Sequence, residues 1–102
     1  MPKAKPGLSD SKSLVPDSFT LAGTRWEVKR EMLTGEMGHC SRDEAIIRLN
    51  NKLAGQIEES TFYHELVHAV LFSMGKTGDK HDEEFVDLFG AFLHQFMLTR
   101  GK

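Results

Sequence analysis

Two histidines and one glutamate form the pattern H-E-x-x-H at His64, Glu65 and His68. Side chains four residues apart share one face of an α-helix, with Cβ atoms about 5–6 Å apart, so both imidazoles can reach a single ion. Glu65 lies about 100° round the helix from His64, which places it beside a zinc-coordinated water and not on the metal itself. The motif predicts zinc as the cofactor, His64 and His68 as ligands, and Glu65 as the general base of a hydrolytic reaction.

The site needs a third protein ligand, because catalytic zinc generally has three and keeps one position for water. The metzincin spacing H-E-x-x-H-x-x-G-x-x-H is excluded, since Leu71 and Met74 stand where its glycine and third histidine would be. Glu83 is the preferred third ligand. Glu84 and His81 are the alternatives, because each lies within two residues of the same point in the chain.

A second carboxylate, Asp87, follows Glu83 by four residues and therefore shares its face of a helix. Asp87 could accept a hydrogen bond from the far nitrogen of a ligand imidazole, which fixes the tautomer and raises the basicity of the ligand. Gly90 continues this stripe, and an interior helix glycine is best explained by close approach of two helices. His94 lies further along the same stripe, and we assign no role to it.

Two segments that precede the motif have the composition of β-strands. Residues 19–30 alternate apolar and polar side chains around Trp26 and Val28, which is typical of a half-buried strand. Residues 45–50 are short, β-branched at the centre and bounded by asparagines, which indicates a second strand. We expect the two strands to pair antiparallel.

The segment between these strands, residues 32–44, is polar and contains two glycines, which predicts a loop. It includes His39 and Cys40, which are adjacent, whereas metal ligands on a loop are usually spaced two to four residues apart. We interpret both as loop residues without a metal-binding role.

After Lys52 the hydrophobic pattern takes the period of a helix. One face would carry Ile57, Phe62, Leu66, Ala69, Val70 and Ser73. This helix contains the motif, and Gly75 could end it. A second helix, capped by Asp79 or Asp82 and running to about Leu98, would have an aromatic face. That face comprises Phe85, Leu88, Phe89, Phe92 and Phe96.

Composition sets the class of protein. The 102 residues are enough for one modest domain, expected at residues 18–102 after a flexible N-terminal tail at residues 1–17. A net charge of −2 gives no basic field for a phosphate backbone, so nucleic acid is not an expected partner. A single cysteine, the absence of a secretory signal and the absence of a long apolar run predict a cytoplasmic protein without a membrane partner.

H-E-L-V-H followed by E-x-x-x-D resembles the gluzincins, metallopeptidases whose third zinc ligand is a glutamate. The runs TFYHELVHAVLF and DEEFVDLFGAFL are similar to compact ImmA/IrrE-type metallopeptidases of phages and bacterial mobile elements. The resemblance implies an α+β minimal zincin, in which a small antiparallel sheet packs on the motif helix and the next helix delivers Glu83. It also implies Asp87 as a carboxylate that supports a ligand, and a phage or prophage origin.

The expected activity is hydrolysis of a peptide or protein substrate, with Tyr63, His81 and His94 as candidate oxyanion donors. An extended substrate could add to the exposed edge of the sheet. The alternative is a non-catalytic module in which zinc stabilises a protein-interaction or regulatory domain. The natural substrate and the oligomeric state are not predicted by the sequence.

Overall fold

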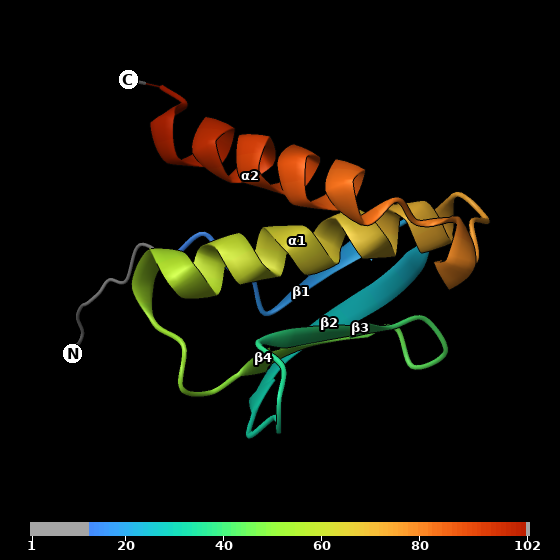
Figure 1. The fold of residues 1–102 in the computed structure, drawn as a ribbon, viewed down its shortest axis with the longest axis horizontal. Coiled ribbons are helices and arrows are strands. Elements are labelled where there is room, and N and C mark those ends of the chain that lie inside the picture. The colour runs from blue at the N-terminus through green and yellow to red at the C-terminus, as the bar shows by residue number, and fades with distance from the viewer. Residues whose placement is uncertain (1–12, 102) are drawn as a thin grey trace.

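The protein folds as an α+β domain, as the sequence predicts, with two long helices and with four strands where two were expected. The structure is a computed structural model that describes residues 13–101. Its elements are β1 (Ser18–Leu21), β2 (Thr24–Glu31), β3 (Gly38–Ser41), β4 (Ile46–Asn50), α1 (Gly55–Ser73), a short 3₁₀ helix (Gly78–Lys80) and α2 (Glu83–Thr99). Figure 1 shows them in three layers, with α1 between the sheet and α2.

The predicted first strand is a hairpin of two strands, β1 and β2. The break falls at Ala22 and Gly23, which both adopt positive φ angles (48° and 82°). Two successive residues with positive φ form the type of tight turn whose twist matches paired strands. The hairpin places Phe19 opposite Trp26, and their rings stack with centroids 6.1 Å apart.

The sheet is mixed, with strand order β1-β2-β4-β3. The prediction that the two strands at residues 19–30 and 45–50 pair antiparallel is wrong, because β2 and β4 are parallel. The reason is the extra strand β3, which contains His39 and Cys40 and reverses the chain once more before β4. The assignment of these two residues to a loop is therefore also wrong.

Helix α1 is the central layer and buries side chains on more than one face. Phe62 and Ala69 are buried as predicted, whereas Ile57 is exposed. The helix ends where expected, because Gly75 takes a positive φ of 86° and its N–H donates to the carbonyl of Phe72. Neither α1 nor α2 has the length and apolar character needed to cross a bilayer, within the described residues.

Helix α2 packs on α1 through a face different from the one that its aromatic residues suggested. Asp82 caps its N-terminus by accepting from the backbone N–H groups of Glu84 and Phe85. The face toward α1 contains Val86 and Gly90, and the predicted aromatic face is exposed to solvent. A Cβ at Gly90 would lie 3.2 Å from the backbone of His64, so the predicted close approach of two helices is confirmed.

The described part of the chain begins at residue 13, before the expected end of the N-terminal tail at residue 17. Val15 is buried in the core, and Leu14 is joined to α1 by two hydrogen bonds. Its N–H donates to Glu59, and its carbonyl accepts from the hydroxyl of Tyr63. The predicted tail therefore does not extend to residue 17, and its first twelve residues lie outside the described part of the chain.

Candidate metal centre

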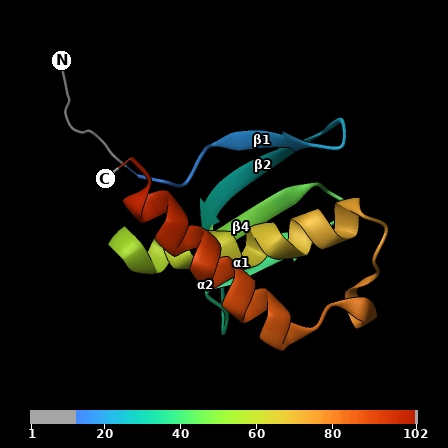
Figure 2. The same cartoon turned by 90° about the horizontal axis from the view of Figure 1, so that it is seen from above.

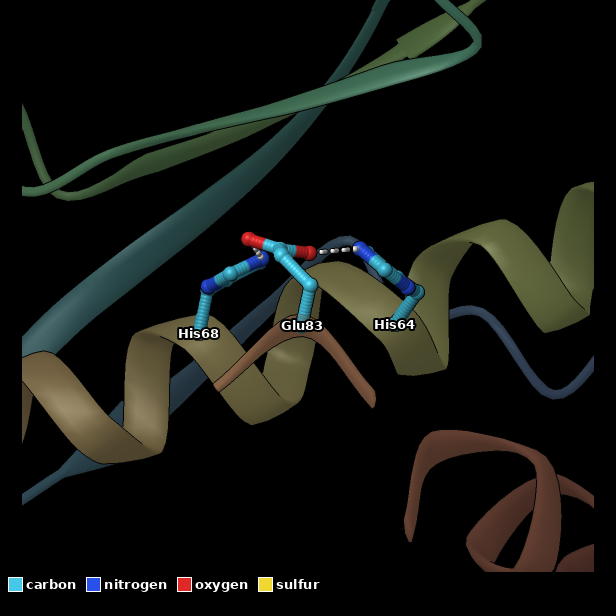
Figure 3. Close-up of side chains that lie close together, drawn as sticks. All are labelled: His64, His68 and Glu83. Atoms are coloured by element: carbon cyan, nitrogen blue, oxygen red, sulfur yellow. Dashed lines mark ion pairs between the residues drawn. The ribbon is translucent and has the colours of Figure 1, made fainter. Parts of the chain in front are cut away.

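Three side chains that the sequence marks as metal ligands converge at one point. His64 and His68 project from one face of α1, and Glu83, the first residue of α2, reaches between them (Figure 3). Its two carboxylate oxygens lie 3.7 Å from His64 Nε2 and 3.5 Å from His68 Nε2. One ligand atom of each residue lies within 4.8 Å of the others.

These separations fit a tetrahedral ion. Zinc binds histidine nitrogen and carboxylate oxygen at about 2.0–2.2 Å, so two ligands of one tetrahedral ion lie about 3.4 Å apart. The distance from each imidazole to its nearer oxygen of Glu83 is close to this value, Oε1 for His64 and Oε2 for His68. Two nitrogens and one oxygen are also a ligand set that catalytic zinc sites use. The residues present could therefore hold zinc if one oxygen of Glu83 and the two imidazole nitrogens, which lie within 4.8 Å of one another, move closer together.

Each of these imidazoles also has a partner on its other ring nitrogen. His64 Nδ1 lies 2.9 Å from a carboxylate oxygen of Asp87. His68 Nδ1 lies 2.7 Å from Nδ1 of His81, whose Nε2 lies 3.0 Å from the carbonyl oxygen of Lys76. Such partners hold Nδ1 protonated and leave Nε2 free to face a metal.

His81 contacts this cluster from the side away from Glu83. Nδ1 of His81 contacts Nδ1 of His68, whereas the carboxylate of Glu83 lies near the other ring nitrogen of His68, Nε2. His81 is buried and is held between the ring of His68 and the ring of Phe72. Glu84, the other alternative for the third ligand, is not part of the converging group.

Burial lowers the pKa of His68 below its ordinary value, although the nearby carboxylate of Glu83 acts in the opposite direction. The charges of His64 and His81 lower it further. A lowered pKa keeps the imidazole neutral at neutral pH, and only a neutral imidazole can donate its lone pair to a metal. His68 is therefore already in the state that metal binding requires.

Glu65 follows His64 on α1, and its side chain lies against Gly38 of β3. Its side chain is buried. Burial, followed by the negative charges of Glu36 and Glu83, raises the pKa of Glu65 to about 7. A carboxylate of this kind can both accept and return a proton near neutral pH, which is the property that a general base needs.

Cys40 lies beside Glu65 but is not a reactive group. Burial, with a smaller contribution from the charge of Glu65, raises the pKa of its thiol to about 12. The thiolate is the nucleophilic and metal-binding form, and it is scarce at neutral pH when the pKa is so high. That Cys40 takes no part in metal binding stays a prediction.

An open cleft runs along α1 beside the edge strand β3. On one side of Glu65 it has a volume of about 560 Å³ and is lined by Gly38, His64 and Asp87, among others. A second hollow of about 240 Å³ continues past His68 and Glu83. Gly38 and Glu65 line both parts, so these two residues lie where the parts of the groove meet.

Gly38 allows β3 to approach Glu65 this closely. A Cβ at residue 38 would lie 2.8 Å from Cγ2 of Thr61, and 3.1 Å and 3.2 Å from Cγ and Oε2 of Glu65. Thr61 has little freedom to move, because its hydroxyl donates to the carbonyl of Ile57. The absence of a side chain at Gly38 therefore sets the width of the cleft at this point.

We expect Gly38→Ala to lower the free energy of unfolding by about 1–3 kcal/mol, the cost typical of one methyl group forced into a packed site. Urea unfolding of the metal-free protein measures it. Gly78→Ala is the matched control, because a Cβ at Gly78 meets nothing within 4 Å. Equal stabilities of the two variants would show that β3 does not pack on Glu65 as described.

Tyr63 and His94 do not reach the cluster, although both were candidate oxyanion donors. The Tyr63 hydroxyl donates to the carbonyl of Leu14, and its ring stacks on His94. His94 Nε2 lies 3.0 Å from the buried carboxylate of Glu59. Both side chains therefore join the N-terminal segment to the helices and are structural.

Two features of the site were not predicted from the sequence. The edge strand β3 escaped notice because its residues, Gly38–Ser41, include no β-branched side chain. His81 was an alternative third ligand, but its contact with Nδ1 of His68 was not predicted, since His81 lies in a turn whose direction the sequence pattern does not fix. The position of His81 directly before the helix cap Asp82 was the available signal.

Comparison with known proteins agrees with this geometry. No curated protein and no solved structure matches the chain. The SprT-like family matches residues 8–95, which is most of the chain and includes every residue of the metal cluster. The family is zinc-associated and related to zincin-like metallopeptidases, and it fits the compact α+β fold. The chain therefore belongs to the SprT-like family.

Proposed function

We propose that the protein is a zinc-dependent metallopeptidase that hydrolyses peptide bonds, with His64, His68 and Glu83 as metal ligands. The observation that carries the proposal is the convergence of two imidazole nitrogens and one carboxylate beside the buried Glu65, in an open groove. Membership of a zinc-associated family supports it. The ImmA/IrrE-type relationship, the phage or prophage origin and the cytoplasmic location stay predictions.

Zinc bound by these ligands would lower the pKa of a coordinated water toward 7 and polarise the substrate carbonyl. Glu65 accepts the proton of the attacking water and returns it to the leaving amine. Asp87 and His81 keep the ligand imidazoles in the tautomer that is protonated on Nδ1, so that Nε2, which faces Glu83, has a free lone pair. These roles are supported by the lining of the groove, which includes Glu65, Asp87 and His81.

We propose that the substrate is an extended peptide segment. Because β3 is the last strand of the sheet, one of its edges is not paired with another strand within residues 13–101. A peptide bound at this edge as an additional strand would gain main-chain hydrogen bonds, and pockets along the groove would select side chains. Glu65 lines both parts of the groove. A peptide that occupied both parts would therefore present a bond to the proposed base.

The alternative is a zinc-stabilised interaction module without catalytic activity. A structural zinc site is generally closed by four protein ligands, whereas a catalytic site keeps an open position. Here Glu83 is exposed and an open groove lies beside the three converging residues, which favours the enzyme.

Zinc analysis and peptide cleavage test the proposal together. The purified chain should contain one zinc ion, cleave an unstructured protein such as casein, lose the activity on treatment with a chelator, and regain it with added zinc. Cleavage that survives complete removal of the metal would rule out the proposed mechanism. Zinc at one ion per chain, without cleavage of casein or of mixed peptides, would favour the interaction module.

A further inference from the structure

The outer surface of α2 carries an exposed apolar stripe. Five large side chains, each 44–65% exposed, share one face of the helix: Phe85, Leu88, Phe89, Phe92 and Phe96. We call this stripe the outer face. No charged residue lies within it, and the rings of Phe85 and Phe89 stack with centroids 5.4 Å apart. Figures 1 and 2 show α2 as the outermost layer, with α1 on its inner side.

The outer face is not needed for the fold of one chain. Helix α2 contacts α1 through Val86, Gly90 and His94, which are buried on another side of the helix. Gly90 lies against the backbone of α1, where there is no room for a side chain. The bulky aromatic side of α2 therefore could not take its place in this contact. Fully buried aromatic side chains cover about 150–250 Å² each, so the half-exposed stripe presents about 500 Å². Patches of this size on a soluble protein generally mark an interface.

We propose that the outer face is a homodimer interface, on which a second copy of the chain packs its own α2. The area supports a second copy as the occupant. Two such stripes together would bury about 1,000 Å², and the residues that flank them would bring the total into the range of stable interfaces, which begins near 1,200 Å². An isologous pair is self-complementary, because each apolar stripe covers the same stripe of its partner.

The spacing and the charges of α2 indicate an antiparallel pair. Side chains repeating every three and four residues form the ridges that interlock when two helices pack at a small angle. The first turn of α2 is acidic, with Glu83 and Glu84 after Asp82, and Arg100 follows its last turn. A parallel pair would place the two acidic turns side by side. An antiparallel pair places each acidic turn near the basic end of the partner helix, and the two helix dipoles then point in opposite directions, which is favourable.

This arrangement leaves the metal cluster accessible. The helix residues that line the groove, Asp87 and Ala91, are turned away from the outer face by the 100° step of the helix. The dimer therefore needs no metal and does not depend on the proposed catalytic function. Both copies would keep an open groove.

The mass of the full chain in solution tests the proposal. Sedimentation velocity of the metal-free protein at micromolar concentrations should give twice the 11.5 kDa mass of one chain. Phe92→Glu places a charge in the middle of the stripe and should weaken dimerisation by at least roughly 30-fold, the loss expected for a central aromatic anchor. Phe92→Ser is a milder second variant in case the glutamate disturbs folding.

Met32→Glu is the matched control, because Met32 is an exposed apolar residue outside the outer face. It should remain dimeric. Circular dichroism and zinc binding of each variant check that the fold is kept. A monomeric wild-type chain at several hundred micromolar would overturn the proposal, as would a folded Phe92→Glu variant that stays dimeric. Binding of the monomer to lipid vesicles or to another protein would then identify a different occupant.

Discussion

Replacing Glu65 by Gln is expected to reduce peptide hydrolysis by at least on the order of a hundredfold, while zinc stays at one ion per chain. The amide keeps the size of the side chain and its place against Gly38, but it cannot accept the proton of the attacking water. Measurement of kcat/KM on a fluorogenic peptide, together with metal analysis of the same sample, separates loss of the base from loss of the metal.

The pH dependence of the rate checks the same residue independently. Because burial and the charges of Glu36 and Glu83 raise the pKa of Glu65 to about 7, the base becomes protonated and the rate falls as the pH decreases. A bound cation favours the carboxylate, so the midpoint of this acidic limb should lie below pH 7. Glu58→Gln is the control, since Glu58 is on the same helix as Glu65 but pairs with Arg30 of β2. An unchanged rate for Glu65→Gln would reject the assignment.

Removal of a ligand should have the largest effect on metal affinity. The binding free energy of a structural zinc ion is about 10–16 kcal/mol, shared among its ligands. The loss of one ligand in His68→Ala or Glu83→Ala should therefore weaken zinc binding on the order of a few hundredfold. The variants should also lose the stabilisation that zinc gives to the folded state, which is about 2.7 kcal/mol at one hundred times Kd. Competition with a chromogenic chelator and thermal unfolding with added zinc measure these two effects.

Two further variants distinguish a ligand from its support. His81→Ala should weaken zinc binding by about 10–100-fold, which is typical for loss of a partner that orients a ligand imidazole. Glu84→Ala should leave affinity unchanged, because Glu84 is outside the converging group. If His81→Ala lowers zinc affinity more than Glu83→Ala does, His81 is the third ligand and Glu83 is not.

The local pattern of the sequence was sufficient for the helices and for the metal motif. The four-residue spacing of His64 and His68 places both imidazoles on one side of any helix that contains them, whatever packs around it. The cap at Asp82 and the end of α1 at Gly75 are equally local, since each depends on a few backbone groups within one turn. Glu83 could be placed near the histidines because it begins the next helix.

The pairing of strands and the packing of α2 depended on contacts between distant segments. Whether β2 and β4 run parallel is decided by β3, a four-residue strand with little pattern of its own. The aromatic side of α2 looked like the buried one, because hydrophobicity alone favours the bulkier stripe. The side that packs is the one with Gly90, since only a small residue lets the helices approach closely enough for Asp87 to reach His64.

The sequence by itself therefore determined which groups could bind a metal, because helical periodicity is a property of neighbouring residues. Only the tertiary structure decided what surrounds those groups. It placed His81 behind His68 and buried Glu65 against β3, and it left the outer face of α2 exposed. These arrangements arise from close packing between elements far apart in the chain, which a pattern of neighbouring residues does not specify.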